Sequence, residues 1–211
     1  MIKLESQFSI SGMRTLSFLF GLALSVHAAE LGNLTGFVRL TNQPVAGAIV
    51  YLGAGSGRAT PTNIVLDVRD GALRPHVQVA TKGSVLVLRN SDPTLHIVRV
   101  ETLSGTNAPA LALTQAMPYA GFQKAFALDG FRDTTLLRVT GGNGEEMSAY
   151  IAVLPHPWGV LTDENGRFAM TGIPAGNYKL YAWHEMFGTL AREVKVMIGR
   201  PTQMDLEFST P

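Results

Sequence analysis

The sequence predicts an all-β protein. Its 22 glycines and 11 prolines separate many short runs of valine, leucine and isoleucine. These runs alternate with polar residues and are bounded by turn dipeptides at spacings of roughly 8–12 residues, which is typical of a β-sandwich or barrel. Helical periodicity is weak, and one stretch, "APALALTQAM" at 108–117, suggests a helix.

Residues 1–28 are expected to be an export signal. A positively charged start leads into an uncharged apolar run at 15–26, and cleavage is expected after Ala28. The alternative is a membrane anchor, but this run is shorter than the about 20 residues needed to cross a bilayer. Translation could begin at Met1 or Met13. The mature chain is therefore expected to be periplasmic or secreted, with no membrane span.

Composition narrows the possible functions. The formal net charge is +1 and no run of like charges occurs, so nucleic acid is not an expected partner. The chain has no cysteine, which excludes disulfides, thiolate metal ligands and cysteine nucleophiles. Stability must then come from the hydrophobic core.

Two distant segments, 34–54 and 159–208, are expected to form one sandwich. The first contains a strand at 37–40, a turn at "TNQP" and the strand "GAIVYL". In the second, Asn165-Gly166 predicts a type I′ turn, because both residues tolerate positive φ.

Together these segments resemble the carboxypeptidase regulatory-like domain, a small transthyretin-like β-sandwich. The first half of the family pattern is matched by Gly36, Val38, Pro44, Gly47, Ala48, Val50 and Leu52. The second half is matched by Thr162, Asp163, Gly166, Phe168, Gly176, Tyr178 and Leu180.

The residues between these segments have a β pattern of their own, with strands expected at 76–80, 84–89 and 95–101 and three more before 155. The motif in this region comprises Gly83, Leu86, Asn90, Asp92 and His96. It resembles the cupredoxin fold, an eight-stranded Greek-key sandwich. The whole chain is similar to exported methylamine-utilisation-like proteins, which combine both folds.

The expected organisation is thus a cupredoxin-like Greek-key sandwich inserted in, or packed on, a carboxypeptidase regulatory-like β-sandwich. After the signal, residues 29–53 and 158–211 form the regulatory-like, carbohydrate-binding-like unit. Residues 54–157 form the cupredoxin-like unit.

The resemblance also implies where copper ligands would lie. A blue-copper site needs two imidazoles, a thiolate and a weak thioether. His96 matches the first histidine and Met147 the methionine, whereas Gly141 and Gly144 stand where the cysteine and second histidine belong. Type 1 copper is therefore excluded.

Two interpretations of these residues stay open. His96 could be a polar residue at a strand end and Met147 a core residue. Alternatively, both could bind copper weakly, with His76 as a third ligand if its strand lies beside that of His96. Imidazole and thioether together suit Cu(I).

Trp158, Trp183 and His184 are candidate ligand-binding residues. Their rings could stack against a carbohydrate or peptide at one end of the regulatory-like unit. The alternative is that both tryptophans pack the junction between the two units. Glu185 could orient an imidazole in a metal site.

No set of catalytic residues can be assembled from the sequence, so an enzyme is not expected. The favoured hypothesis is a non-catalytic exported binding or adaptor protein whose partner is an envelope protein or a glycan. The competing hypothesis is a periplasmic copper-binding protein that uses the residual His/Met site.

Overall fold

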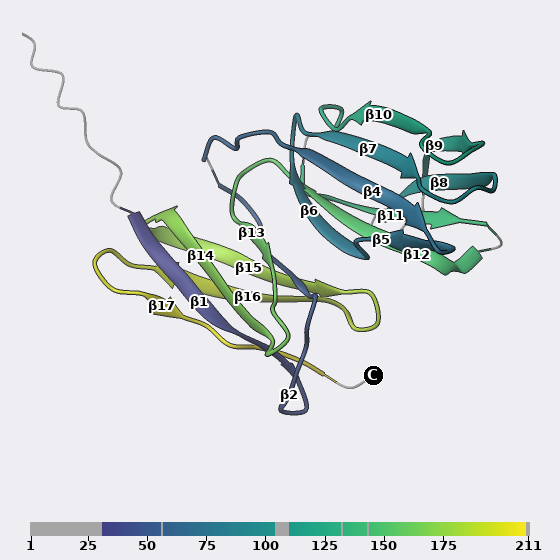
Figure 1. Cartoon of the computed structure of the whole chain (residues 1–211). Coiled ribbons are helices and arrows are strands. Elements are labelled where there is room, and N and C mark those ends of the chain that lie inside the picture. Colours follow the sequence, from purple (N-terminus) through teal and green to yellow (C-terminus); the bar gives the residue numbers. More distant parts are fainter. Residues whose placement is uncertain (1–30, 56, 104–109, 132, 143, 210–211) are drawn as a thin grey trace, which may run out of the picture.

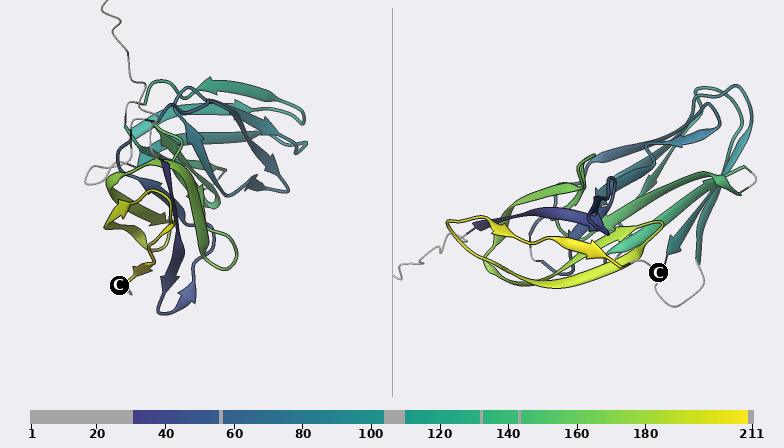
Figure 2. Two further views of the ribbon diagram at one scale, coloured as in Figure 1. Left: turned by 90° about the vertical axis from the view of Figure 1, so that its left-hand side faces the viewer. Right: turned by 90° about the horizontal axis from the view of Figure 1, so that it is seen from below.

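The computed structural model describes residues 31–55, 57–103, 110–131, 133–142 and 144–209. The expected export signal lies outside this part of the chain. The described residues form strands, turns and loops without a helix, so the fold is all-β as predicted. They accordingly include no helix that is long and apolar enough to cross a membrane. The strands form two sandwiches that pack against each other (Figures 1 and 2).

The first sandwich joins the beginning and the end of the chain. One of its sheets is built on β1, which pairs with β14, β17, β18 and β2. The other has the order β13-β3-β15-β16. The strands of the first sheet are β1 (Leu31–Leu40), β2 (Gln43–Pro44), β14 (Arg167–Pro174), β17 (Thr202–Gln203) and β18 (Leu206–Phe208). Those of the second are β3 (Ile49–Leu52), β13 (Gly159–Leu161), β15 (Gly176–His184) and β16 (Gly188–Val196).

The second sandwich uses only the residues between these two segments. Its sheets have the orders β10-β7-β4-β5 and β6-β12-β11-β8-β9. The first comprises β4 (Asn63–Arg69), β5 (Ala72–Arg74), β7 (Val85–Asn90) and β10 (Gln123–Ala127). The second comprises β6 (Val77–Thr81), β8 (His96–Leu103), β9 (Ala110–Met117), β11 (Thr135–Gly141) and β12 (Gly144–Leu154). The chain passes from the first sandwich to the second between β3 and β4 and returns between β12 and β13.

Each sandwich has its own core because its strands alternate buried and exposed side chains. In the first, Leu34, Val50 and Leu180 are fully buried between the sheets. In the second, Leu66 and Leu137 are equally buried.

A third cluster joins the sandwiches, and we call it the interface cluster. Ile49, Tyr51 and Trp183 contribute from the first sandwich, and Ala152 and Leu154 from the second. All five are buried, so the two units share an apolar contact.

The predicted helix at 108–117 is wrong where this stretch is described. Residues 110–117 form β9, which pairs antiparallel with β8. Alanine and leucine favour helices, but pairing with a neighbouring strand outweighs so weak a preference.

The predicted type I′ turn at Asn165-Gly166 is also wrong. Only Gly166 has a positive φ, of 72°, and its N–H donates to the Asp163 carbonyl. The Asp163 carboxylate accepts the N–H groups of Asn165 and Arg167, which fixes a different turn. Paired positive φ values occur instead at Thr41-Asn42 and Asp70-Gly71, each between two antiparallel strands.

Candidate functional site

A methionine side chain packs against Gly141, the residue at which the cupredoxin resemblance implies a cysteine ligand. Gly141 ends β11 and is buried, and a Cβ atom added to it would collide with the Sδ atom of Met147. Met147 is 6% exposed and belongs to the core of the second sandwich. Its thioether therefore packs in the space that a side chain at residue 141 would need.

His96 begins β8 and is held by neighbouring polar groups. Its Nε2 lies 3.1 Å from Asp92 Oδ2 and 3.2 Å from Thr94 Oγ1. The N–H groups of Gly71 and Asp70 donate to the Asp92 carboxylate. These bonds, together with His96, outweigh partial burial and lower the pKa of Asp92. His96 therefore faces a carboxylate that is fixed by the β4–β5 turn.

His76 does not meet the condition for a third ligand. Its strand neighbour β6 is separated from β8 by β12 and β11. His76 Nδ1 lies 2.9 Å from the Ser148 carbonyl oxygen, and Nε2 lies 2.8 Å from Glu185 Oε1. Both ring nitrogens thus have protein partners, and the bond to Glu185 joins the two sandwiches. Among the described residues, no three His, Asp or Glu side chains are grouped to hold a metal.

Sequence reasoning missed the partnership of His76 and Glu185. It placed Glu185 beside His184, its chain neighbour, whereas the fold places it against a histidine 109 residues away. No local sequence signal could reveal this contact, because it depends on how the sandwiches pack.

Neither tryptophan offers a ring face to a ligand. Trp158 is 4% exposed, packs in the core of the first sandwich and donates its Nε1–H to the Gly172 carbonyl. Trp183 is 7% exposed within the interface cluster, with its ring 5.0 Å from that of Tyr150. Trp183 therefore lies at the junction between the units, as the packing alternative expects, whereas Trp158 lies in the core of the first sandwich. Neither ring leaves room for stacking by a saccharide.

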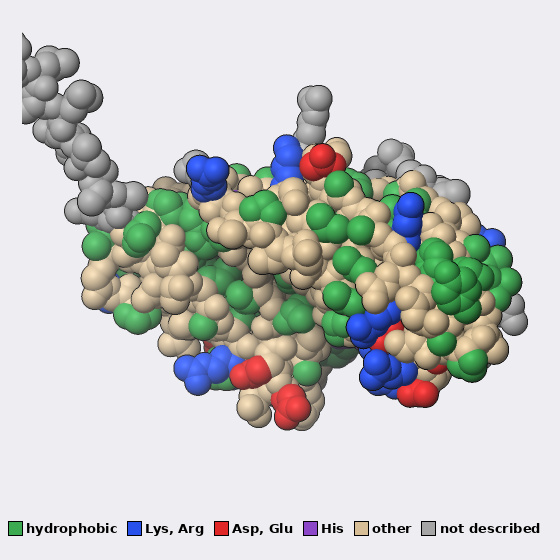
Figure 3. Space-filling view, turned by 45° about the horizontal axis from the view of Figure 1, so that its top comes forward, with side chains coloured by type: hydrophobic (Ala, Val, Ile, Leu, Met, Phe, Trp, Pro, Cys, Tyr) green, Lys and Arg blue, Asp and Glu red, His purple; other side chains and the backbone are tan. Residues whose placement is uncertain are grey.

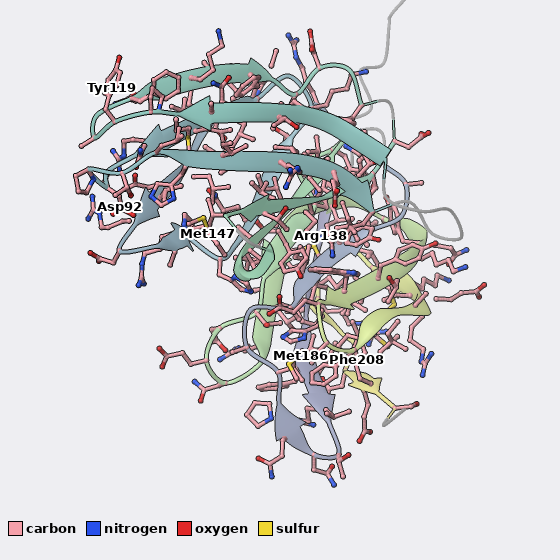
Figure 4. All side chains as sticks on the ribbon, turned by 90° about the vertical axis from the view of Figure 1, so that its right-hand side faces the viewer. Asp92, Tyr119, Arg138, Met147, Met186 and Phe208 are labelled. Atoms are coloured by element: carbon pink, nitrogen blue, oxygen red, sulfur yellow. The ribbon has the colours of Figure 1, made fainter. Side chains whose placement is uncertain are left out.

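His184 lies at the end of β15 and is half-buried. Its ring stacks on Phe187 with centroids 4.7 Å apart, and its Nδ1 accepts the Met186 N–H. Burial lowers the pKa of His184; the charge of Glu185 raises this pKa, and His76 lowers it further. Met186 beside it is 76% exposed (Figure 4).

The end of the second sandwich near His96 exposes apolar side chains that the sequence analysis did not single out. We call Leu95, Ile97 and Tyr119 the apolar end; they are 58%, 43% and 60% exposed. Leu95 and Ile97 flank His96, and Tyr119 follows β9, whose Met117 pairs with His96. A group of hydrophobic side chains covers this end of the molecule (Figure 3), and Tyr119 projects from it (Figure 4).

The apolar end carries no Lys, Arg, Asp or Glu of its own. Leu95 and Ile97 belong to the stretch 93–98 and Tyr119 to the stretch 110–123, and neither stretch contains a Lys, Arg, Asp or Glu. Apolar residues at 95 and 97 alternate with the apolar residues Val98 and Val100 on the opposite face of the strand. Because one of the two faces must point away from the core, this pattern could have predicted the exposed apolar end from the sequence.

A separate hollow of about 480 Å³ lies where β3 leaves the side of β15. Gly53, Gly55, Asn177, Lys179 and Tyr181 are among its lining residues. The Tyr181 ring stacks on Tyr51 with centroids 5.2 Å apart and lies 5.6 Å from Lys179 Nζ. This hollow combines an aromatic ring with amide and ammonium groups.

The comparisons with known proteins are sparse. No protein-family model and no curated protein sequence matches the chain. Solved structures of amicyanin resemble part of it: a reduced tryptophan-to-tyrosine mutant aligns at 14% identity with a TM-score of 0.34, over 49% of this chain and 97% of that chain. A Cu(I) methionine-to-alanine mutant of amicyanin aligns over the same shares at 14% identity and a TM-score of 0.29.

Proposed function

We propose that the chain is a non-catalytic, exported binding or adaptor protein that docks an envelope protein on its apolar end. The observation that supports this proposal best is that Leu95, Ile97 and Tyr119 are all exposed and that none of them is charged. Aromatic and aliphatic side chains are typical anchors of protein interfaces, whereas the cores of such interfaces are poor in charge.

In this proposal the second sandwich is a cupredoxin-like unit without blue-copper ligands, and the first is a carboxypeptidase regulatory-like unit. Met147 packed over Gly141 supports the loss of the thiolate position. Export to the periplasm or the medium follows from the expected signal at 1–28.

The competing copper-binding function has fewer candidate ligands in the structure than the sequence suggested. His76 bonds to Ser148 and Glu185, which leaves His96 and Met147 as the remaining ligands. A glycan remains a second candidate ligand, and the hollow beside Tyr181 supports it better than the buried tryptophans do.

Site-specific photo-crosslinking in cells tests the proposal. A photoreactive phenylalanine analogue would replace Tyr119, and the matched control would carry it at Ile198, which is 49% exposed on the first sandwich. We expect one discrete adduct with an envelope protein from position 119, and its loss when Ile97→Ser is added. Equal adducts from both positions, or none from position 119, would contradict a docking role for the apolar end.

A further inference from the structure

The strand β9 is the last strand of the sheet β6-β12-β11-β8-β9. It pairs with β8 on one side, and no strand among the described residues pairs with its other side. Ala112, Thr114 and Ala116 are exposed on it, and Leu113 and Gln115 are half-buried. The strand has neither charge nor proline. Figure 1 shows it beside β8, with β10 of the other sheet above it. Such edges can accept another strand, because a row of backbone N–H and C=O groups is unpaired. On β9 the Ala116 carbonyl accepts from Gln115 Nε2 and the Met117 carbonyl accepts from Asn90 Nδ2, so a second strand would pair with the backbone of residues 112–115.

The other long edges in the described part of the chain carry features that oppose strand pairing. β16 has Arg192, Glu193 and Lys195, and β10 has Lys124. β14 begins with Arg167 and ends with Pro174. β6 is uncharged, but Val77 and Val79 on it pack against the interface cluster. Charges, prolines and covering elements are the usual ways in which proteins block edges, and β9 itself contains neither a charge nor a proline.

We propose that two copies of this chain associate by antiparallel pairing of β9 with β9 of the second copy. A two-fold axis near Thr114 would place Thr114 of one copy opposite Thr114 of the other. The same residues would then form both sides of the contact. No like charges would meet, because neither strand is charged. Small side chains at residues 112, 114 and 116 would let the sheets continue without steric conflict. The chain's net charge of +1 also adds little repulsion between copies.

This association goes beyond the proposed function and is independent of it. Antiparallel pairing sends the Met117 ends of the two strands in opposite directions. Tyr119 follows each Met117, so the two apolar ends would lie at opposite ends of the pairing and both stay open. The dimer would then present two docking surfaces instead of one.

Analytical ultracentrifugation of the chain without residues 1–28 tests the proposal over a concentration series. We expect a monomer–dimer equilibrium, with a dimer dissociation constant raised roughly fivefold to tenfold by Thr114→Lys. Thr114→Asp should have the same effect, and mixing the two variants should restore the dimer because opposite charges then meet. The matched control is Thr189→Lys, which adds the same charge at an exposed position of β16 and should leave the equilibrium unchanged.

Three results would overturn the proposal: a monomer at every concentration, a dimer that resists Thr114→Lys, or a mixture of the two charged variants that stays monomeric. Circular dichroism of each variant separates loss of pairing from loss of folding. Thr114 is exposed, so we expect the variants to keep the spectrum of the parent protein.

Discussion

Apolar side chains gather at two places outside the sandwich cores, and the two groups differ in how much of each side chain is exposed. In the interface cluster, Trp183, Tyr51 and Leu154 are at most 7% exposed. At the apolar end, Leu95 and Tyr119 are more than half exposed. Burial of the first set contributes to folding, because removing apolar surface from water is favourable. The second set contributes little to folding, and in the proposed function it contacts a partner protein.

The largest expected effect comes from emptying the interface cluster. Trp183→Ala should lower the free energy of unfolding by about 3–5 kcal/mol, because a buried aromatic ring is replaced by a cavity. Urea unfolding measures this, and it would also show whether the two sandwiches then unfold in separate transitions. A loss below about 1 kcal/mol would mean that the sandwiches do not depend on this contact.

The packing of Met147 over Gly141 predicts a somewhat smaller effect. Gly141→Ala should cost about 1–3 kcal/mol through overpacking. In the Met147→Ala background the same change should cost less, because the colliding sulfur is gone. A double-mutant cycle measures the coupling. Additivity within about 0.5 kcal/mol would contradict the contact.

Acidification below neutral pH should weaken the fold through His156. Burial lowers the pKa of His156 below 6.5, although its bond to the Leu52 carbonyl opposes this shift. The unfolded chain therefore binds a proton below pH 6.5 before the folded chain does. Stability is fully present above that pH and is lost as the pH falls toward the folded pKa.

The half-buried His184, whose pKa burial also lowers, should add to this slope. Each such proton contributes up to about 1.4 kcal/mol per pH unit. Unfolding by urea at pH 7, 6 and 5 measures the slope, and His184→Gln should reduce it. Stability that increases between pH 7 and 5 would refute the assignment.

The smallest effect is expected at the apolar end. Tyr119→Ala should change the free energy of unfolding by less than about 0.5 kcal/mol, because an exposed side chain leaves no cavity. The same urea titration measures it. A loss comparable to that of Trp183→Ala would show that Tyr119 supports the fold and remove the contrast between the two regions.

Alternating patterns made much of the fold predictable from the sequence. The runs around β7, β8, β11 and β12 were recognised because their side chains alternate between core and surface. The region of β9 was not, because alanine and leucine are common in helices and only its pairing with β8 decides the strand.

The candidate site was predictable where it depended on local pattern and unpredictable where it depended on packing. The cupredoxin resemblance singled out His96 and Met147, and the structure places His96 at the start of β8 and Met147 in the core of the second sandwich. The contact between His76 and Glu185 did not, because it joins two sandwiches whose relative placement no local pattern encodes. The burial of Trp183 had the same origin, whereas Trp158 is buried within the core of the first sandwich.

The central claim is that the end of the second sandwich near His96 is a protein-docking surface and not a copper site. A Cu(I) titration against a competing chelator, followed by the NMR signals of the His96 ring and the Met147 methyl group, tests it most directly. We expect the NMR signals of the His96 ring and the Met147 methyl group to stay unchanged up to one equivalent of copper. We also expect His96→Ala to leave the copper titration unaltered. Stoichiometric shifts of both signals, abolished by His96→Ala, would contradict it.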